Sequence, residues 1–369
     1  MNPFKYGRVV DKQDYCPRPA LERQLRSRIQ SGQNVYIEGE RRTGKTSLII
    51  NTIASMKGKK HVYIDLLEVK TVQDIHKRVL HGILQSHRET GFITRMLTGL
   101  AALRPALGFD PMTGLPTISL DNSIDLPPDS LEGLLDLFLR RDFRNHAVVI
   151  DEFQDILNLP DARAVQAVMR GRIQFIQNVP FVFCGSVRSR INLIFNDPDS
   201  PFYKAALPTD VGPIERSGFS AFLTAKFKRA GMALSPAVLN RIFAITGENP
   251  GDTQQLCAAL FDVSERGTGL SEDSVNEALV RVFSQEQKGY EAHMARITAV
   301  QLKCLCALAR HGGKNILSRD FMTVSGIKNP TTIKKSFKRM ENLKIVFNTE
   351  SQYKFVNPFF GQWLVYRNF

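Results

Sequence analysis

Residues 39–46 read GERRTGKT, in which four residues separate two glycines and the second glycine precedes lysine and threonine. This is the pattern GxxxxGK[ST], whose glycines let backbone N–H groups curl around phosphates without a Cβ in the way. Lys45 would supply charge to the outer phosphates, and the Thr46 hydroxyl would bind Mg²⁺. The segment therefore predicts a site for ATP and Mg²⁺, formed by Gly39, Glu40, Arg41, Arg42, Thr43, Gly44, Lys45, Thr46 and Ser47.

Two adjacent acids follow a second apolar run. HAVVIDEF, residues 146–153, is typical of a strand buried on both faces. Asp151 at the end of this strand would hold Mg²⁺ through water, so Thr46 and Asp151 are the expected metal residues. Glu152 would orient or deprotonate the attacking water. Lys45 and Glu152 are therefore candidate catalytic residues for ATP hydrolysis.

A third apolar run, VPFVFCGS at 179–186, ends in Gly185 and Ser186. In a parallel sheet it would end at the same edge as the other strands, where ligands of such folds gather. Ser186 is a third candidate catalytic residue, because it can hydrogen-bond the γ-phosphate or the attacking water. The alternative is that it caps a turn into the next segment.

The elements around these motifs indicate an α/β fold. A short β-rich run, NVYIE, precedes the Gly-rich loop, and a helical pattern follows it, which is the order that phosphate binding requires. HVYIDLL at 61–67 predicts another strand, and residues 130–145 predict a helix. Within 91–128, the turn residues Asp-Pro-Met-Thr-Gly between two extended runs predict an inserted β-hairpin. Its role stays open between contact with DNA, contact with a neighbouring subunit and a local lid.

The character of the chain changes after residue 215. Four helical segments separated by Gly, Ser or Pro predict an all-α lid at 216–288, after a P-loop ATPase core at 1–215. From 289 to 369 the pattern is helix, helix, helix, hairpin and a closing helix or strand. This order is that of a winged helix-turn-helix domain.

Positive charge is concentrated in this C-terminal segment. Of a net charge of +13, a net +10 lies between Lys288 and Phe369, where 14 Lys and Arg face 4 Asp and Glu. Such a field suggests a polyanionic partner, and a merely basic soluble surface is the alternative. On the third helix of the tail, Ile333, Phe337 and Met340 have core spacing, which turns the opposite face outward. That face would bind duplex DNA through Thr331, Lys334, Lys335, Lys338 and Arg339.

Several motifs together resemble the archaeal-type ATPase family, a member of the AAA+/STAND group of P-loop proteins close to the origin-recognition ATPases. The motifs are GERRTGKTSL, VVIDEFQDI, FVFCGSVRS, SPFYKAALP and GENPGDTQQL. The resemblance covers nearly the whole chain. It implies an ASCE-type (AAA+) parallel-sheet core, a helical lid and a tail that binds DNA or protein. It also implies that the lead-in before residue 25, with an Arg-x-x-Glu-like box, packs near the adenine.

The chain departs from that family at two places. Lys204 stands where members often have Arg, and GENPGDTQQL has no evident lid arginine. Arg188 and Arg190 are the remaining candidates for an arginine finger, and the equal alternative is that they are solvated or salt-bridged. Whether the chain forms a homo-oligomer stays open.

Two functions fit these observations. One is an ATPase, slow or stimulated by a partner, that couples nucleotide state to duplex DNA binding. The other is a STAND-type signalling switch whose winged helix binds a protein. Five cysteines without a CxxC pair, no signal peptide and no long apolar run predict a cytoplasmic protein with free buried thiols and no membrane contact. The biological process and any DNA sequence specificity stay open.

Overall fold

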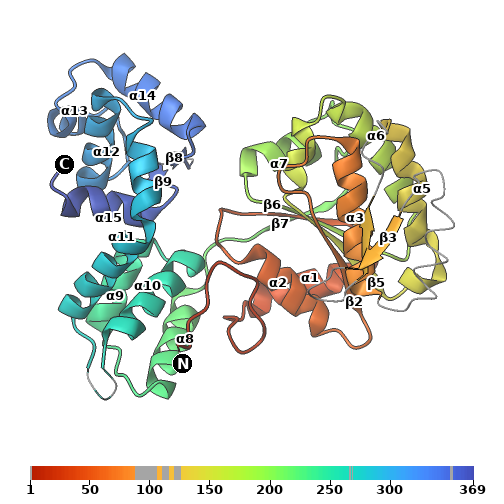
Figure 1. Ribbon diagram of the computed structural model, residues 1–369, viewed down its shortest axis with the longest axis horizontal. Helices are drawn as coiled ribbons and strands as arrows, with labels where there is room; N and C mark the ends of the chain where they lie inside the picture. Colours follow the sequence, from red (N-terminus) through yellow and green to blue (C-terminus); the bar gives the residue numbers. More distant parts are fainter. Residues whose placement is uncertain are drawn as a thin grey trace. The chain divides into compact units, whose positions relative to one another are not determined.

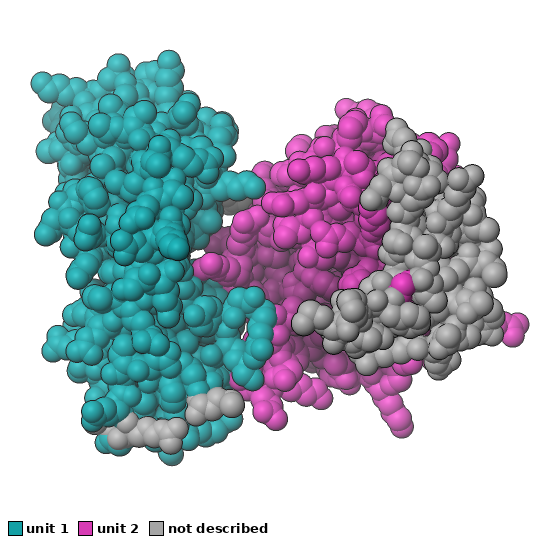
Figure 2. All heavy atoms as spheres, viewed as in Figure 1, with its two compact units in different colours: residues 1–8, 214–369 teal, residues 9–213 magenta. Residues whose placement is uncertain are grey.

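The computed structural model describes residues 2–87, 106–109, 116–119, 126–265, 267, 269–349 and 352–369. The chain forms two compact units, shown in Figure 2. One unit contains Val9–Pro213, and the other contains Met1–Arg8 together with Ile214–Phe369. The first eight residues therefore group with the C-terminal part and not with the core, to which the sequence assigned them. A separate lid and winged-helix domain stay a prediction, because both lie in one unit.

The unit Val9–Pro213 is built on a parallel sheet with strand order β2-β5-β6-β1-β7 (Figure 1). Strand β6 lies between β1, which precedes the Gly-rich loop, and β5, which ends in Asp151. This arrangement confirms the predicted α/β fold with a parallel P-loop core. The strands are β1 Val35–Glu38, β2 Lys60–Asp65, β5 His146–Asp151, β6 Phe181–Gly185 and β7 Leu207–Asp210.

Helices cover both faces of this sheet. Alternation along β1 sends Val35 and Ile37 to one face and Tyr36 to the other, which creates two apolar clusters. One cluster includes residues of α1 and α2, and the other includes residues of α3, α6 and α7. Because β5 and β6 lie between both layers, every residue in them is buried. The helices are α1 Pro19–Gln30, α2 Lys45–Ala54, α3 Val72–Ser86, α6 Ala162–Ile173 and α7 Arg188–Phe195.

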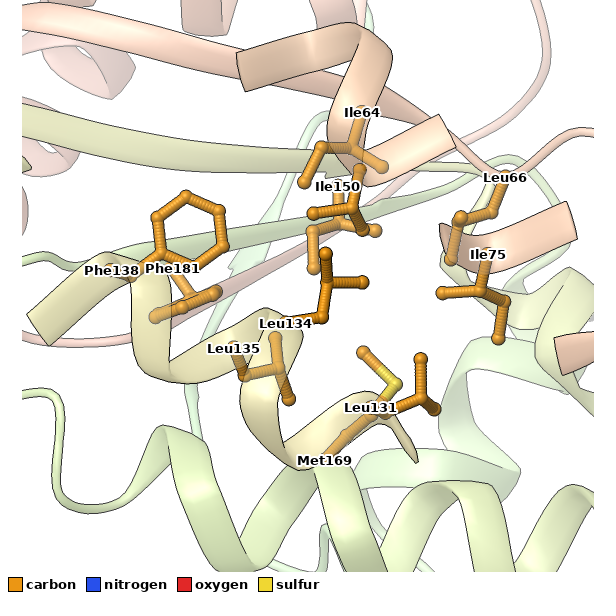
Figure 3. Close-up of a pocket in the computed structure, with 11 residues that line it drawn as sticks. Ile64, Leu66, Ile75, Leu131, Leu134, Leu135, Phe138, Ile150, Met169 and Phe181 are labelled. Carbon is orange, nitrogen blue, oxygen red and sulfur yellow. The ribbon is translucent and has the colours of Figure 1, made fainter. Parts of the chain in front are cut away.

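Figure 3 shows a small hollow within the second cluster, where side chains from the sheet and the covering helices converge. Ile64 and Ile150 of the sheet face Leu134 and Met169 of the helices. All the side chains that line this hollow are apolar. It is therefore part of the packed core, and the chemistry must lie elsewhere.

The predicted helix at 130–145 is wrong. The segment consists of η2 Pro128–Ser130, α5 Leu131–Leu135, η3 Asp136–Leu139 and η4 Arg141–Phe143. Leu134, Leu135, Leu137 and Phe138 are all buried, and their spacing would place them on one side of a regular α-helix as well. The apolar spacing therefore indicated a helical segment, but not that it continues in 3₁₀ turns after Leu135.

Of the predicted hairpin insertion at 91–128, the structure describes two paired strands. Strand β3 Ala106–Phe109 is antiparallel to β4 Pro116–Ser119. The rest of the predicted insertion up to residue 125, including the turn, lies outside the described residues.

In the second unit, four helices form the segment that we call the lid: α8 Arg216–Arg229, α9 Pro236–Thr246, α10 Pro250–Val263 and α11 Glu272–Met294. The N-terminal residues pack on them. The ring of Phe4 lies 4.6 Å from that of Phe227, and the Asn2 amide donates to the Ala258 carbonyl (2.9 Å) and the Asp262 carboxylate (2.8 Å). These contacts explain why residues 1–8 group with this unit.

Residues after the lid form three helices, a two-stranded wing and a last helix. They are α12 Ala299–His311, α13 Arg319–Ser325, α14 Pro330–Asn342, β8 Val346–Asn348, β9 Tyr353–Phe355 and α15 Pro358–Tyr366. Ile333, Phe337 and Met340 are fully buried, as their spacing predicts. The predicted winged-helix order is confirmed, and its closing element is a helix.

A carboxylate on α11 joins the lid to the winged helix. Glu286 accepts hydrogen bonds from Gln255 of α10 (2.5 Å), from Tyr290 (3.0 Å) and from Asn357 before α15. The fully buried Tyr290 ring lies 5.3 Å from that of Trp363. The two segments therefore share one interior. The five cysteines are free and buried, and none of the described helices is long and apolar enough to cross a membrane.

Candidate nucleotide-binding site

The two glycines of GERRTGKT each meet a backbone requirement. Gly44 has φ 82° and ψ 25°, in the left-handed region that glycine adopts without strain, and immediately precedes α2. A Cβ on Gly39 would lie 2.7 Å from the Val211 carbonyl oxygen, which is too close for any other residue. The loop thus leads directly into the N-terminus of α2, where free N–H groups favour anions.

Lys45 is buried at the start of α2 and lies across the loop. Its Nζ donates to the carbonyl oxygens of Gly39 (2.9 Å) and Glu40 (2.7 Å). The Thr43 hydroxyl also donates to the Glu40 carbonyl (2.8 Å). The ammonium is therefore held inside the curve of the loop, and Glu40, Arg41 and Arg42 are the exposed positions of the motif.

Thr46 and Asp151, 105 residues apart in sequence, meet at the edge of the sheet. The Thr46 hydroxyl donates to Asp151 Oδ2 at 2.6 Å, and the Tyr63 hydroxyl donates to the same oxygen at 2.9 Å. Burial and the Asp151 charge raise the pKa of Tyr63, so it stays a hydrogen-bond donor. A hydroxyl beside a carboxylate is an oxygen donor set that suits Mg²⁺.

Glu152 directly follows β5 in a left-handed conformation, with φ 50° and ψ 38°. Its Oε2 accepts hydrogen bonds from Ser186 Oγ (2.7 Å) and from the Gln154 amide. Ser186 at the end of β6 therefore contacts the carboxylate expected to act on water. Its expected contact with the γ-phosphate or the water itself stays a prediction.

Two polar residues fasten the lead-in to the loop and α2. Ser47 Oγ accepts a hydrogen bond from the backbone N–H of Val10 (3.2 Å). This hydroxyl therefore holds the N-terminal lead-in against α2. Buried Arg18 donates to the carbonyl oxygens of Thr43 and Gly212, both at 2.6 Å. Its backbone N–H donates to Glu22 (2.7 Å), and the packing of this lead-in near the adenine stays a prediction.

The two arginine-finger candidates are both paired within their own unit. Arg188 donates to Asp210 at 2.6 Å and lies 3.9 Å from Glu38, whose pKa is raised by burial. Arg190 donates to Asn158 at 2.8 Å and lies 3.5 Å from Asp155. Their pairing matches the salt-bridged alternative; a role on a neighbour's nucleotide stays a prediction.

The candidate DNA-binding residues lie together on the outward side of α14. All are exposed, while the opposite side of the helix is buried in the domain. The ammonium of Lys338 lies 3.5 Å from Glu341, one turn along the helix. The set comprises Thr331, Lys334, Lys335, Lys338 and Arg339.

Two residues of the site, Tyr63 and Gln154, were not predicted from sequence, and neither were the contacts of Arg18 with Thr43 and Gly212. The spacing of Gln154, two residues after Glu152, was a usable signal, because residues just after an acidic strand end can reach back to it. Tyr63 lies in the middle of β2 and gave no signal. Only the pairing of β2 with β5, which places Tyr63 beside Val149, shows that it can reach Asp151.

Comparison with known proteins agrees with this architecture. Residues 288–366 match a family model described as a probable winged helix domain. No curated protein sequence matches the chain. A solved Walker-type ATPase of Pyrococcus abyssi is similar in structure, with a TM-score of 0.63 and 16% identity over 96% of this chain and 97% of that chain. The fold is that of a Walker-type P-loop ATPase with a C-terminal winged helix.

Two solved proteins of Aeropyrum pernix are also similar. The Orc1 protein, in complex with DNA, has a TM-score of 0.51 and 15% identity, over 96% of both chains. The Orc2 protein, in ADPNP and ADP complexes, has a TM-score of 0.50 and 15% identity, over 99% of both chains. The similarity predicted to origin-recognition ATPases is thus found at the level of the fold, over nearly the whole chain.

Proposed function

We propose that this protein binds and hydrolyses ATP and that its nucleotide state controls duplex DNA binding by the winged helix. The observation that carries the proposal is the 2.6 Å hydrogen bond between Thr46 and Asp151. It brings the end of the phosphate loop and the end of the acidic strand to one point. A loop that served only as a turn would not require a hydroxyl next to a buried carboxylate at this point.

The residues at this point divide the chemistry among them. Backbone N–H groups from Gly39 to Thr46 and the Lys45 ammonium bind the phosphates. Thr46 and Asp151 would hold Mg²⁺, which neutralises charge on the phosphates. Glu152 orients the attacking water and accepts its proton, while Ser186 fixes the carboxylate by its hydrogen bond.

DNA binding is proposed from the charge and exposure of α14. The exposed Lys and Arg of this helix are the groups that neutralise phosphates and reach base edges in a major groove. The Orc1 relative was solved in complex with DNA, and the Orc2 relative with ADPNP and ADP, which supports testing both kinds of ligand here.

The hydrolysis part is tested with two variants of the phosphate site. Lys45→Ala should abolish nucleotide binding, measured with a fluorescent ATP analogue. Glu152→Gln should retain that binding and lose turnover, measured as phosphate release. Wild-type hydrolysis by Glu152→Gln would show that Glu152 does not activate the water.

A signalling switch that binds a protein is the second candidate. It is favoured by exposed apolar side chains at the end of the chain, Val365 (40%), Tyr366 (57%) and Phe369 (41%). Such side chains suit protein contact better than contact with phosphates. Duplex binding that weakens steeply with salt supports the DNA function; absence of binding at low salt supports the switch.

A further inference from the structure

The geometry points to Gln154 as a positioning residue that holds the Glu152 carboxylate for attack by water. We propose that its amide, together with Ser186, selects which carboxylate oxygen faces the water. The inference rests on the proposed ATP hydrolysis and adds a residue for which no role in it was expected.

Gln154 is almost completely buried, with 1% of its surface exposed. Its Nε2 donates to Glu152 Oε2 and lies 3.4 Å from Asp155 Oδ1. Both acceptors are carboxylate oxygens, so the amide nitrogen faces negative charge on each side. Hydrogen bonds to ionised acceptors are stronger than those between neutral groups, which fixes this end of the side chain.

The other end of the same amide has no hydrogen bond. Gln154 Oε1 is buried and lacks a partner within the described residues. A buried unsatisfied oxygen is costly, and a methionine of similar size would avoid this cost. The amide is therefore not explained by packing, but by what its nitrogen donates to.

The surroundings allow only this orientation of the amide. Rotation by 180° would place Oε1 against Oε2 of Glu152, where two acceptors repel. On the far side, a Cβ on Gly185 would lie 2.7 Å from Gln154 Oε1 and 2.9 Å from the Ile191 side chain. The absence of a side chain at Gly185, directly before Ser186, thus leaves the space that the glutamine occupies.

Gln154 and Ser186 donate to the same oxygen of Glu152, and both approach Oε2. Elsewhere in the described part of the chain no hydrogen bond reaches Oε1 of this carboxylate. With Oε2 occupied by two donors, Oε1 is the oxygen left to accept the proton of water. The left-handed backbone of Glu152 holds the side chain near both donors.

The test compares Gln154→Met with Gln166→Met in steady-state ATP hydrolysis by the full chain. Gln166 is a matched control, since it is 5% exposed and its amide contacts the Ala162 carbonyl (3.2 Å) and Ser200 (3.3 Å) instead of Glu152. Gln154→Met should lower kcat about 10-fold, as loss of an outer partner does at other catalytic sites, with KM and ATP affinity unchanged. Gln166→Met should keep the wild-type kcat.

A second variant covers the case in which Gln154→Met does not fold. Gln154→Asn keeps a neutral amide but shortens the side chain by one methylene, so the amide no longer reaches Glu152 and kcat should fall as in Gln154→Met. In the Glu152→Gln background, Gln154→Met should add no further loss in single-turnover hydrolysis, because it acts through Glu152.

The outcomes separate this inference from the proposed function. Unchanged kcat in both Gln154 variants, with an active wild type, overturns the inference and leaves the ATPase function standing. An equal loss in Gln154→Met and Gln166→Met, or a weaker ATP affinity, assigns Gln154 a structural role and also overturns it. A wild type without hydrolysis, with or without DNA, overturns both.

Discussion

The substitution Tyr63→Phe removes one hydroxyl and tests whether its hydrogen bond to Asp151 strengthens the binding of Mg²⁺ by that carboxylate. The Tyr63 hydroxyl donates to Asp151 Oδ2 at 2.9 Å, and Thr46 donates to the same oxygen at 2.6 Å. The substitution leaves the ring and the sheet in place. It therefore removes one side-chain donor to this oxygen and little else.

The expected effect follows from the strength of this hydrogen bond. A bond to a charged acceptor contributes roughly 1.5–3 kcal/mol, and the half-buried position of Tyr63 favours the lower end. Loss of an outer partner at metal sites typically weakens the metal by about 10- to 100-fold. We expect the affinity for Mg²⁺ to fall about 10-fold, which is equivalent to about 1.4 kcal/mol of binding free energy.

The assay is a Mg²⁺ titration of ATP hydrolysis at saturating ATP, alongside ATP-analogue binding in EDTA. Tyr63→Phe should shift the Mg²⁺ midpoint and leave metal-free binding unchanged. The matched control is Tyr36→Phe, whose hydroxyl donates to Asn196 (3.1 Å) on the same sheet and not to Asp151. Equal midpoints for wild type and Tyr63→Phe would refute the role of Asp151 as the supported metal residue.

Three further predictions concern other parts of the chain. Burial and the neighbouring charges lower the pKa of His146 to about 4, so the unfolded chain binds a proton at this position before the folded chain does as pH falls below about 6.5. This histidine should therefore make the chain about 2 kcal/mol less stable at pH 5 than at pH 7, and His146→Leu should reduce the difference seen in urea unfolding by about that amount. Phe4→Ala should destabilise the unit that contains the lid by roughly 3 kcal/mol, seen in hydrogen exchange of α8 and α10, and no change there would contradict the packing of residues 1–8. Replacement of Lys334, Lys335 and Lys338 by Ala should lower the salt slope of duplex binding by about 2.7, and an unchanged slope would remove α14 from the interface.

Local patterns explain why much of the fold was predictable. GERRTGKT, the buried strand before Asp151 and the basic helix at 330–342 each contain their own signal within a few residues. Their spacing alone indicates a loop before a helix, a strand buried on both faces and a helix with one apolar side. The structure confirms these elements.

Contacts set by topology were not predictable from the same patterns. Tyr63 reaches Asp151 only because β2 pairs with β5, and Asn2 reaches Ala258 across 256 residues. The 3₁₀ turns after Leu135 are not visible in the apolar spacing, because α-helical and 3₁₀ segments can bury the same side chains. Such features depend on the whole packing and leave no periodic signal.

The coupling of the phosphate site to DNA is tested most directly by steady-state ATP hydrolysis, with and without duplex DNA, at low and moderate salt. The account predicts stimulation by duplex that fades as salt rises, because the exposed Lys and Arg of α14 must first neutralise phosphates. A rate that is indifferent to duplex, together with no duplex binding at low salt, would contradict it.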